Sequence, residues 1–273
     1  MRLTLLARGQ IDAFEVRAPD GSPLTREVWL RQVLSSPIEF THFRQNYLFL
    51  PTTGLDGQII GGGVGRPKRI RSDEPTVDGF EPVDRQLWHA SIVLLDPSHH
   101  DDGQKLAIER GHAGAPLAIA KSLAAHLNKS NPPSPYVVEV GVIADGGSFW
   151  DFVERHEGNV VSATFEFYAP NMFDIGSDYE RDMADLQAQE NVEKASLNIQ
   201  SSTGLRLKTP RIENAIEAVE RGTGTARARA RNSEKYNSSD SAKTATVEEP
   251  EAIKNAPLLE RVKRAVSIIF GHE

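Results

Sequence analysis

The sequence predicts an α/β or α+β fold, with helices covering one face of a mixed β-sheet and an amphipathic helix near the C-terminus. Three observations lead to this fold class. Short apolar runs bounded by glycine or proline, which are typical of strands, recur along the 273 residues. Between them lie segments in which apolar residues return at helical spacing. Residues 159–168 alternate apolar and polar side chains, which predicts a strand with one covered face.

Composition limits the kinds of protein this chain can be. Hydrophobic residues make up 39% and charged residues 25% of the chain, as in ordinary globular proteins. There is no cysteine, which excludes disulfides and thiolate metal sites. No segment reaches the roughly 18 apolar residues of a membrane-spanning helix, and the apolar run at the N-terminus is too short for a signal peptide. We therefore expect a cytoplasmic protein that does not bind membranes.

The chain is expected to form one body over residues 1–235, β-rich over 1–86 and α/β over 87–235. A mobile hairpin or linker over 236–256 and a C-terminal helix over 257–273 follow it. Within the β-rich part, weak alternation predicts a strand over 2–8, and Ser22-Pro23 opens a helix that Pro37 stops. Tyr47 to Leu50 is a buried-strand candidate. The acidic, proline-punctuated residues 72–86 are expected to form an exposed loop.

The remaining elements follow from similar local signals. Strands are predicted over 88–95, 136–143 and 159–168, with helices that start at Pro116 and at Ser148 as a cap. A polar helix is predicted over 178–195, and one or two short strands over 197–207. Thr209 caps the next helix, Pro210 takes its first position and Gly222 ends it. Thr244 to Val247 is considered as a returning strand, and Pro257 starts the terminal helix.

Residues 222–231, Gly-Thr-Gly-Thr-Ala-Arg-Ala-Arg-Ala-Arg, carry the main functional signal. In a strand, Arg227, Arg229 and Arg231 form a row on one face, about 7 Å apart. Guanidinium groups offer bidentate donors to nucleic-acid phosphates. The net charge of −7 restricts such contact to this cluster, because the overall field repels phosphate. The alternative interpretation is a solvated face, neutralised by acids of the preceding helix, Glu213, Glu217 and Glu220.

A second basic segment follows the glycines between Gly61 and Gly65. It carries Arg66, Lys68, Arg69 and Arg71, and a glycine-rich loop before basic residues can cradle phosphates. It is not a P-loop, because the Gly-Lys-Ser/Thr ending is absent, and Pro67 excludes the helix of a dinucleotide fingerprint. The alternative interpretation is a flexible hairpin with a charged tip that resists aggregation.

The loop at residues 96–102 gathers His99, His100, Asp101 and Asp102 after a strand. Histidine and carboxylate side chains can hold Mg²⁺ or Mn²⁺, so a metal-dependent nuclease is an alternative function. Neighbouring residues in one loop rarely close a metal shell without distant ligands, for which the candidates are His89, His112 and His126. The other interpretation is a polar loop at the rim of a sheet, without a metal.

Features of the C-terminal half occur in the same order in a bacterial family of unassigned function. A strand ends in Pro-Asn (Phe165 to Asn171), and a polar helix and a Gly-Leu strand (Gly204-Leu205) follow. A helix, Gly-x-Gly and a basic strand (Ile212 to Arg231) complete the order. The chain resembles that family, which is associated with phage-defence and mobile-element gene neighbourhoods. The resemblance implies a cytosolic defence role and brings no catalytic residues.

Together these observations predict a non-enzymatic subunit of a bacterial phage-defence-type system that contacts nucleic acid, either RNA or DNA. The arginine strand contacts backbone phosphates, and the basic residues after the glycine run form a second clamp. No cofactor is expected. A protein partner or a second copy of the chain is expected to bind. A further alternative is a structural or assembly protein that oligomerises through its C-terminal helix.

Overall fold

The computed structural model describes most of the chain. The described residues are 1–7, 21–22, 24–53, 55, 57–98, 103–111, 113–129, 135–168, 192, 194–248, 250 and 256–271. The chain divides into two compact units, each built from three segments. Unit 1 comprises Met1–Arg26, Ser98–Leu106 and Ser130–Thr246, and unit 2 comprises Glu27–Pro97, Ala107–Lys129 and Val247–Glu273. The fold is of the mixed α+β kind, with antiparallel strand pairs and separate helices.

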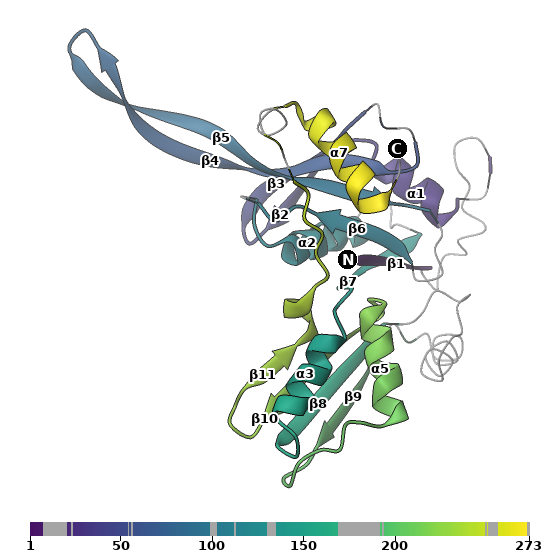
Figure 1. Cartoon of the computed structure of the whole chain (residues 1–273). Coiled ribbons are helices and arrows are strands. Elements are labelled where there is room, and N and C mark those ends of the chain that lie inside the picture. Colours follow the sequence, from purple (N-terminus) through teal and green to yellow (C-terminus); the bar gives the residue numbers. More distant parts are fainter. Residues whose placement is uncertain are drawn as a thin grey trace. The chain divides into compact units, whose positions relative to one another are not determined.

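Unit 1 contains two groups of antiparallel strands (Figure 1). In the first, β1 (Arg2–Ala7) lies between β6 (Gln104–Ile108) and β7 (Tyr136–Gly141). The second, called the four-stranded sheet below, has the order β11-β10-β8-β9. Its strands are Lys235–Asn237, Gly224–Ala230, Val160–Tyr168 and Lys194–Gln200, in the same order. Both β9 and β10 run antiparallel to β8 between them, and α5 (Pro210–Glu220) connects them, which makes a split β-α-β unit.

Two helices pack on the apolar side of the four-stranded sheet. Phe149 of α3 (Gly147–Arg155) makes edge contacts with Phe165 and Tyr236, at ring-centroid distances of 5.9 and 5.4 Å. Helix α5 packs on β10. On that side β10 presents only small, buried side chains, namely Ala226, Ala228 and Ala230. Small side chains on the strand let the helix backbone approach closely, which explains the alanine at every second position of β10.

The bounds of α5 follow from three local signals. The side chain of Thr209 accepts a hydrogen bond from the Ile212 N–H, and Pro210 takes the first helical position. Gly222, with φ 77°, ends the helix. Its N–H donates to Val219, and the next N–H, of Thr223, donates to Ala218. The predicted cap, proline and terminating glycine are all confirmed, and they place β10 directly after the helix.

Unit 2 is built on four antiparallel strands, β2 (Ile38–His42), β3 (Gln45–Pro51), β4 (Ile60–Thr76) and β5 (Gly79–Asp96). The pairing of β3 with β4 ends at Gly65, whereas β4 and β5 stay paired as far as Thr76 and Gly79. Within the described ranges, residues 66–89 therefore continue past β3 as two strands alone, visible as the long arm in Figure 1. We call this segment the ribbon.

Three further helices are α1 (Arg26–Val33), α2 (Pro116–Asn128) and α7 (Leu258–Phe270). In α7, Val262 and Ala265 are buried in a cluster with Ile59, Ile92 and Leu94 of unit 2. Most apolar residues of α7 are therefore used within its own unit, whereas Ile268 stays 45% exposed. None of the helices in the described ranges has the length and apolar character needed to cross a membrane.

Most predicted elements are present, with shifted bounds, but several predictions are wrong. Residues 72–86, expected to be a loop, form the far part of the ribbon. Ser148 does not cap α3, because the N-cap is Gly146 and the Ser148 hydroxyl donates to the Asp145 carbonyl at 2.6 Å. Strands β2 and β6 were not predicted, and Thr244 to Val247 forms no strand. Most of the predicted helix over 178–195 lies outside the described residues, and its last two residues belong to β9.

Candidate nucleic-acid interface

The open side of the four-stranded sheet carries two of the three predicted arginines. Arg227 and Arg229 lie on β10 and are exposed, while the alanines beside them are buried. The predicted strand, with arginines on one face, is confirmed for this pair. Arg231 lies one residue beyond β10, after a register shift, and its Nη2 donates to the Ser202 carbonyl at 2.9 Å. The third arginine is therefore not part of the predicted row.

The register of the four strands aligns polar residues with each arginine. One row across the sheet is Lys235, Arg229, Ser162 and Gln200, and the next is Asn237, Arg227, Thr164 and Asn198. Neighbouring strands lie about 4.8 Å apart and the two rows about 7 Å apart. We call these two rows the polar face. The residues on the outer strand β9 and the charged residues are exposed, while Ser162, Thr164 and Asn237 are half-buried.

The one carboxylate in the next row across the sheet, among the described residues, is already compensated. Glu166 lies opposite Thr225 on β10, and its Oε2 is 2.9 Å from the Lys194 Nζ. The hydrogen bond from Lys194 holds the pKa of Glu166 below its ordinary value, and the charge of Arg227 lowers that pKa further. The same bond raises the pKa of Lys194. Both groups therefore stay ionised near neutral pH and form an ion pair.

The acids proposed as partners of the arginine row lie on the other side of the sheet. Glu213, Glu217 and Glu220 belong to α5, which packs on the alanine side of β10. Glu220 accepts from the Gly146 N–H at 3.1 Å, and Glu217 lies 4.0 Å from the Arg221 guanidinium. In the part of the chain that the structure describes, neither Arg227 nor Arg229 forms an ion pair or a side-chain hydrogen bond.

The predicted phosphate cradle at the second basic segment is wrong. Residues 61–65 are not a loop but part of β4, paired with β3 on one side and β5 on the other. A Cβ at Gly61 would lie 2.6 Å from the Val262 Cγ1, and one at Gly62 would lie 2.6 Å from the Leu50 carbonyl oxygen. The chain itself fills the space beside these glycines, so they make room for α7 and β3 rather than for a phosphate.

The predicted second clamp is divided between the two faces of the ribbon. Because strand residues alternate, Arg66 and Lys68 lie on one face, and Arg69 and Arg71 lie on the other. The Arg66 Nη1 also donates to the Gln45 Oε1 at 2.9 Å. The four basic side chains therefore cannot converge on one phosphate.

The predicted metal loop cannot be assessed, since His99, His100, Asp101 and Asp102 lie outside the described residues, as does His112. Of the proposed distant ligands, His89 lies opposite Arg66 in the ribbon and His126 lies in α2. Over the described ranges, no group of three or more histidine, aspartate or glutamate side chains could hold a metal ion.

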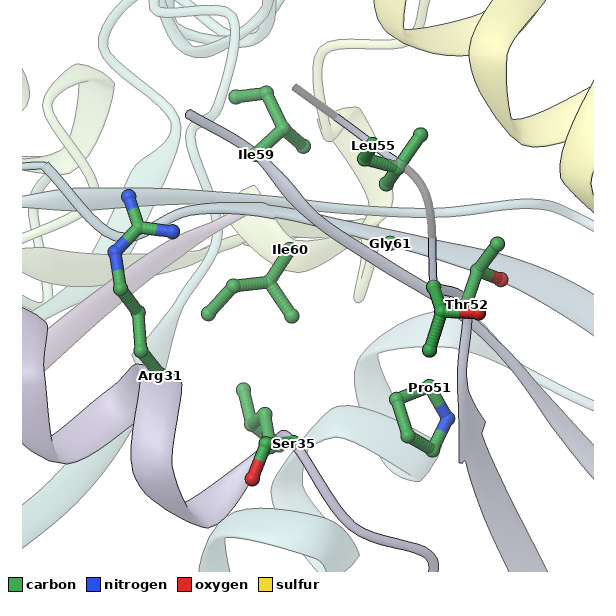
Figure 2. A pocket seen from close by; sticks show the side chains of 10 residues that line it. Arg31, Ser35, Pro51, Thr52, Leu55, Ile59, Ile60 and Gly61 are labelled. Carbon is green, nitrogen blue, oxygen red and sulfur yellow. The ribbon is translucent and has the colours of Figure 1, made fainter. Parts of the chain in front are cut away.

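A pocket of about 230 Å³ in unit 2 lies beside α1 (Figure 2). Its lining is mixed, with apolar residues such as Pro51, Ile59 and Ile60 beside the hydroxyls of Ser35, Thr52 and Thr53. Its one lining cation, Arg31, is paired with Glu27 at 2.9 Å and donates to the Gln58 carbonyl at 3.1 Å. The pocket therefore offers no arrangement of acid, base and nucleophile.

Among the described residues, the polar face is the arrangement best suited to bind a ligand, because it gathers exposed hydrogen-bonding groups. No family model, curated protein or solved structure matches this chain. Any function must then be argued from the groups themselves. Guanidinium groups donate to phosphate oxygens in pairs, and the amides of Asn198 and Gln200 can both donate and accept. The Asn237 Oδ1 already accepts from the Ser239 N–H at 3.2 Å, which leaves its NH₂ group to donate. The two rows carry no aromatic side chain on which a base could stack.

Sequence reasoning missed the part of the polar face on β9. Residues 194–200 read Lys-Ala-Ser-Leu-Asn-Ile-Gln, and the exposed positions are the polar ones. This alternation is as regular as that of β8 and is a strand signal. The sequence prediction assigned residues 194 and 195 to a polar helix and 197–200 to a following strand. It therefore did not identify Asn198 and Gln200 as part of one polar strand face.

Proposed function

We propose that this chain is a non-enzymatic subunit that binds the phosphate backbone of nucleic acid through the polar face. The observation that carries the proposal is the pair of exposed guanidinium groups of Arg227 and Arg229, which have no ion pair among the described residues. Two such groups about 7 Å apart repel each other, and a partner with regularly spaced negative charges removes that repulsion.

The local charge also favours a polyanion. In this proposal, helices cover only one face of the four-stranded sheet, and the polar face on the other side is open to a partner. The polar face carries the positive charges of Arg227, Arg229 and Lys235. Glu166 of the adjoining row is paired with Lys194, which lies opposite Tyr168 one row further on, so this pair adds no net charge. The chain as a whole has a net charge of −7. Binding is therefore confined to this face and is expected to depend strongly on salt.

The residue types predict backbone contact rather than base recognition. Stacking platforms for single strands use exposed aromatic residues, and the two rows have none. Amide, hydroxyl and guanidinium groups contact phosphates and sugars without reading sequence. RNA and DNA both fit this chemistry. The resemblance noted above extends the proposal to a subunit of a bacterial phage-defence system that acts in the cytoplasm with a protein partner and without a cofactor.

The test is a titration of labelled RNA and DNA oligonucleotides of several sequences at several salt concentrations, followed by fluorescence anisotropy. The double variant Arg227→Ala/Arg229→Ala is expected to bind about tenfold more weakly on every sequence. The slope of log affinity against log salt is expected to become shallower by about 2, because two phosphate contacts are lost.

The matched control is Arg155→Ala/Lys208→Ala. It also removes two positive charges, but these belong to exposed ion pairs with Glu234 and Glu154 and not to the polar face. It is expected to leave affinity and salt slope unchanged. Equal affinity of the Arg227/Arg229 variant and the wild type would sink the proposal. Equal losses in both double variants would show that only net charge matters.

A further inference from the structure

The ribbon exposes large apolar side chains at both of its ends. Trp88, near its base, is 52% exposed, and Phe80, near its tip, is 77% exposed. Two strands without a third strand or a helix beside them are marginally stable in water. Exposed aromatic residues on such a segment indicate a surface that a partner covers.

Trp88 and Phe80 lie on the same face of the ribbon. Cross-strand partners share a face, and every second pair returns to it. From base to tip, this face carries the pairs Pro67–Trp88, Arg69–Gln86, Arg71–Asp84, Asp73–Pro82 and Pro75–Phe80. All of these residues are exposed except Pro67, which is half-buried. We call this surface the Trp88 face.

On either side of its central pair, the Trp88 face is complementary to its own reverse. An aromatic residue paired with a proline stands at each end, a basic residue follows one end, and an acidic residue precedes the other. The central pair, Arg71 with Asp84, is neutral as a whole. A two-fold axis through that pair sets Arg71 and Asp84 each against its own copy, while the two stay opposite each other across the strands of each chain. The same axis sets Arg69 of one copy against Asp73 of the other, and Trp88 of one against Phe80 of the other. Both contacts then occur twice, as in any isologous interface.

We infer that two copies of this chain associate through their ribbons, with the Trp88 faces packed against each other and the ribbons antiparallel. This goes beyond the proposed function and does not depend on it. The face spans eight residue steps, or about 26 Å along the strand. A contact patch of that length and only two strands wide is smaller than most specific interfaces, so the dimer is expected to be weak and concentration-dependent.

Three other ways to cover the ribbon fit it less well. Strand addition at its edges is opposed by Pro67, Pro75 and Pro82, since proline has no N–H to donate. Nucleic acid can accept a two-stranded ribbon in its major groove. However, the Trp88 face carries two aspartates beside its two arginines and does not attract phosphate. The apolar residues of α7, Val262 and Ala265, are already buried within unit 2 and cannot also cover the ribbon.

The experiment measures the mass in solution of the nuclease-treated full chain over a concentration series, by sedimentation velocity. Arg69→Asp alone sets acid against acid at both copies of the contact, and Asp73→Arg alone sets base against base. Each is expected to raise the dimer dissociation constant by at least about tenfold. An equimolar mixture of the two variants restores opposite charges at both contacts and is expected to return to the wild-type dissociation constant.

The matched control is Lys68→Asp, which makes the same change of charge on the opposite face of the ribbon and is expected to dimerise like the wild type. Rescue in the mixture also shows that both single variants are folded. A wild type that stays monomeric at every concentration overturns the inference, as does a dimer that ignores the charge reversals. Binding of the ribbon to nucleic acid, seen as an affinity loss in Arg69→Asp with a monomeric wild type, overturns it as well.

Discussion

The polar face and the Trp88 face begin from the same sequence pattern and end with different chemistry. Each has two arginines separated by one residue on an exposed strand, Arg227 with Arg229 and Arg69 with Arg71. Across the polar face, the neighbours are hydroxyls, amides and one lysine. On the Trp88 face, they are aspartates, prolines, aromatic residues and one amide, Gln86 opposite Arg69. An arginine pair therefore indicates a partner only together with the residues that the adjacent strands place beside it.

Both arginine pairs also follow glycines, and in neither case do those glycines face a ligand. Gly222 ends α5 with a positive φ of 77°. Gly61 and Gly62 leave the room that Val262 and the Leu50 backbone occupy. A glycine run before basic residues is thus explained here by the packing of the chain against itself.

The largest effect, on the affinity for nucleic acid, is expected when carboxylates are placed beside the arginines of the polar face, as on the Trp88 face. Ser162→Asp and Asn237→Asp place a carboxylate across the strand from Arg229 and Arg227. These carboxylates pair with the arginines and repel phosphate, so the affinity for nucleic acid is expected to fall by about a hundredfold at low salt. Anisotropy titration measures it. The neutral double variant Ser162→Asn/Asn237→Ser should stay within about twofold of wild type, and a similar loss there contradicts the electrostatic explanation.

The next effect concerns the glycines. Gly62→Ala puts a methyl group 2.6 Å from the Leu50 carbonyl oxygen, where backbone must move. We expect the free energy of unfolding to fall by about 2 kcal/mol, measured by urea denaturation. Gly147→Ala is the control, since its nearest neighbour is the Asp145 side chain at 3.3 Å, which can turn away. Unchanged stability of Gly62→Ala would return the glycine run to the candidates for a ligand site.

The smallest effect concerns the pH dependence of stability, through the buried His42 of unit 2. His42 is buried, its Nδ1 lies 2.8 Å from the Ser122 hydroxyl, and burial lowers its pKa below the ordinary 6.5. Well above pH 6.5, both the folded and the unfolded chain hold this ring neutral. As the pH falls below that value, the unfolded chain binds the proton first, so stability declines until the lower folded pKa is passed.

The variant His42→Gln should therefore show a flatter decline in unfolding free energy between about pH 7 and about pH 5 than the wild type. Urea denaturation at both pH values measures the difference. If the two chains decline in parallel, the titration of His42 does not contribute to acid sensitivity.

Local signals predicted the elements that position the arginines. Thr209, Pro210 and Gly222 act within one turn of α5, so their roles can be read from sequence and are confirmed. The alternation of residues 159–168 likewise predicted the buried side of β8. The arginine pair on an exposed strand was also predicted, because the period of a strand is a local property.

Pairing over long separations could not be read in the same way. Prolines and acids over residues 72–86 indicate a loop, yet Pro75 and Pro82 lie at ribbon positions that tolerate a missing N–H. The rows of the polar face depend on the register of β8 with β9 and β10, which no local pattern encodes. The glycine run was misread because Val262, which fills the space beside Gly61, lies far along the chain.

The division of each unit into three separated stretches has a consequence for how the chain reaches its native state. Strand β1 pairs with β7, and α7 packs on β4 and β5, so both units must close long loops before these contacts give any stabilisation. Topologies of this kind acquire their native state slowly, on the order of milliseconds to seconds for the simplest cases. Neither unit can be excised as one continuous piece, and fragments made by cutting at a single point are expected to lack an autonomous core.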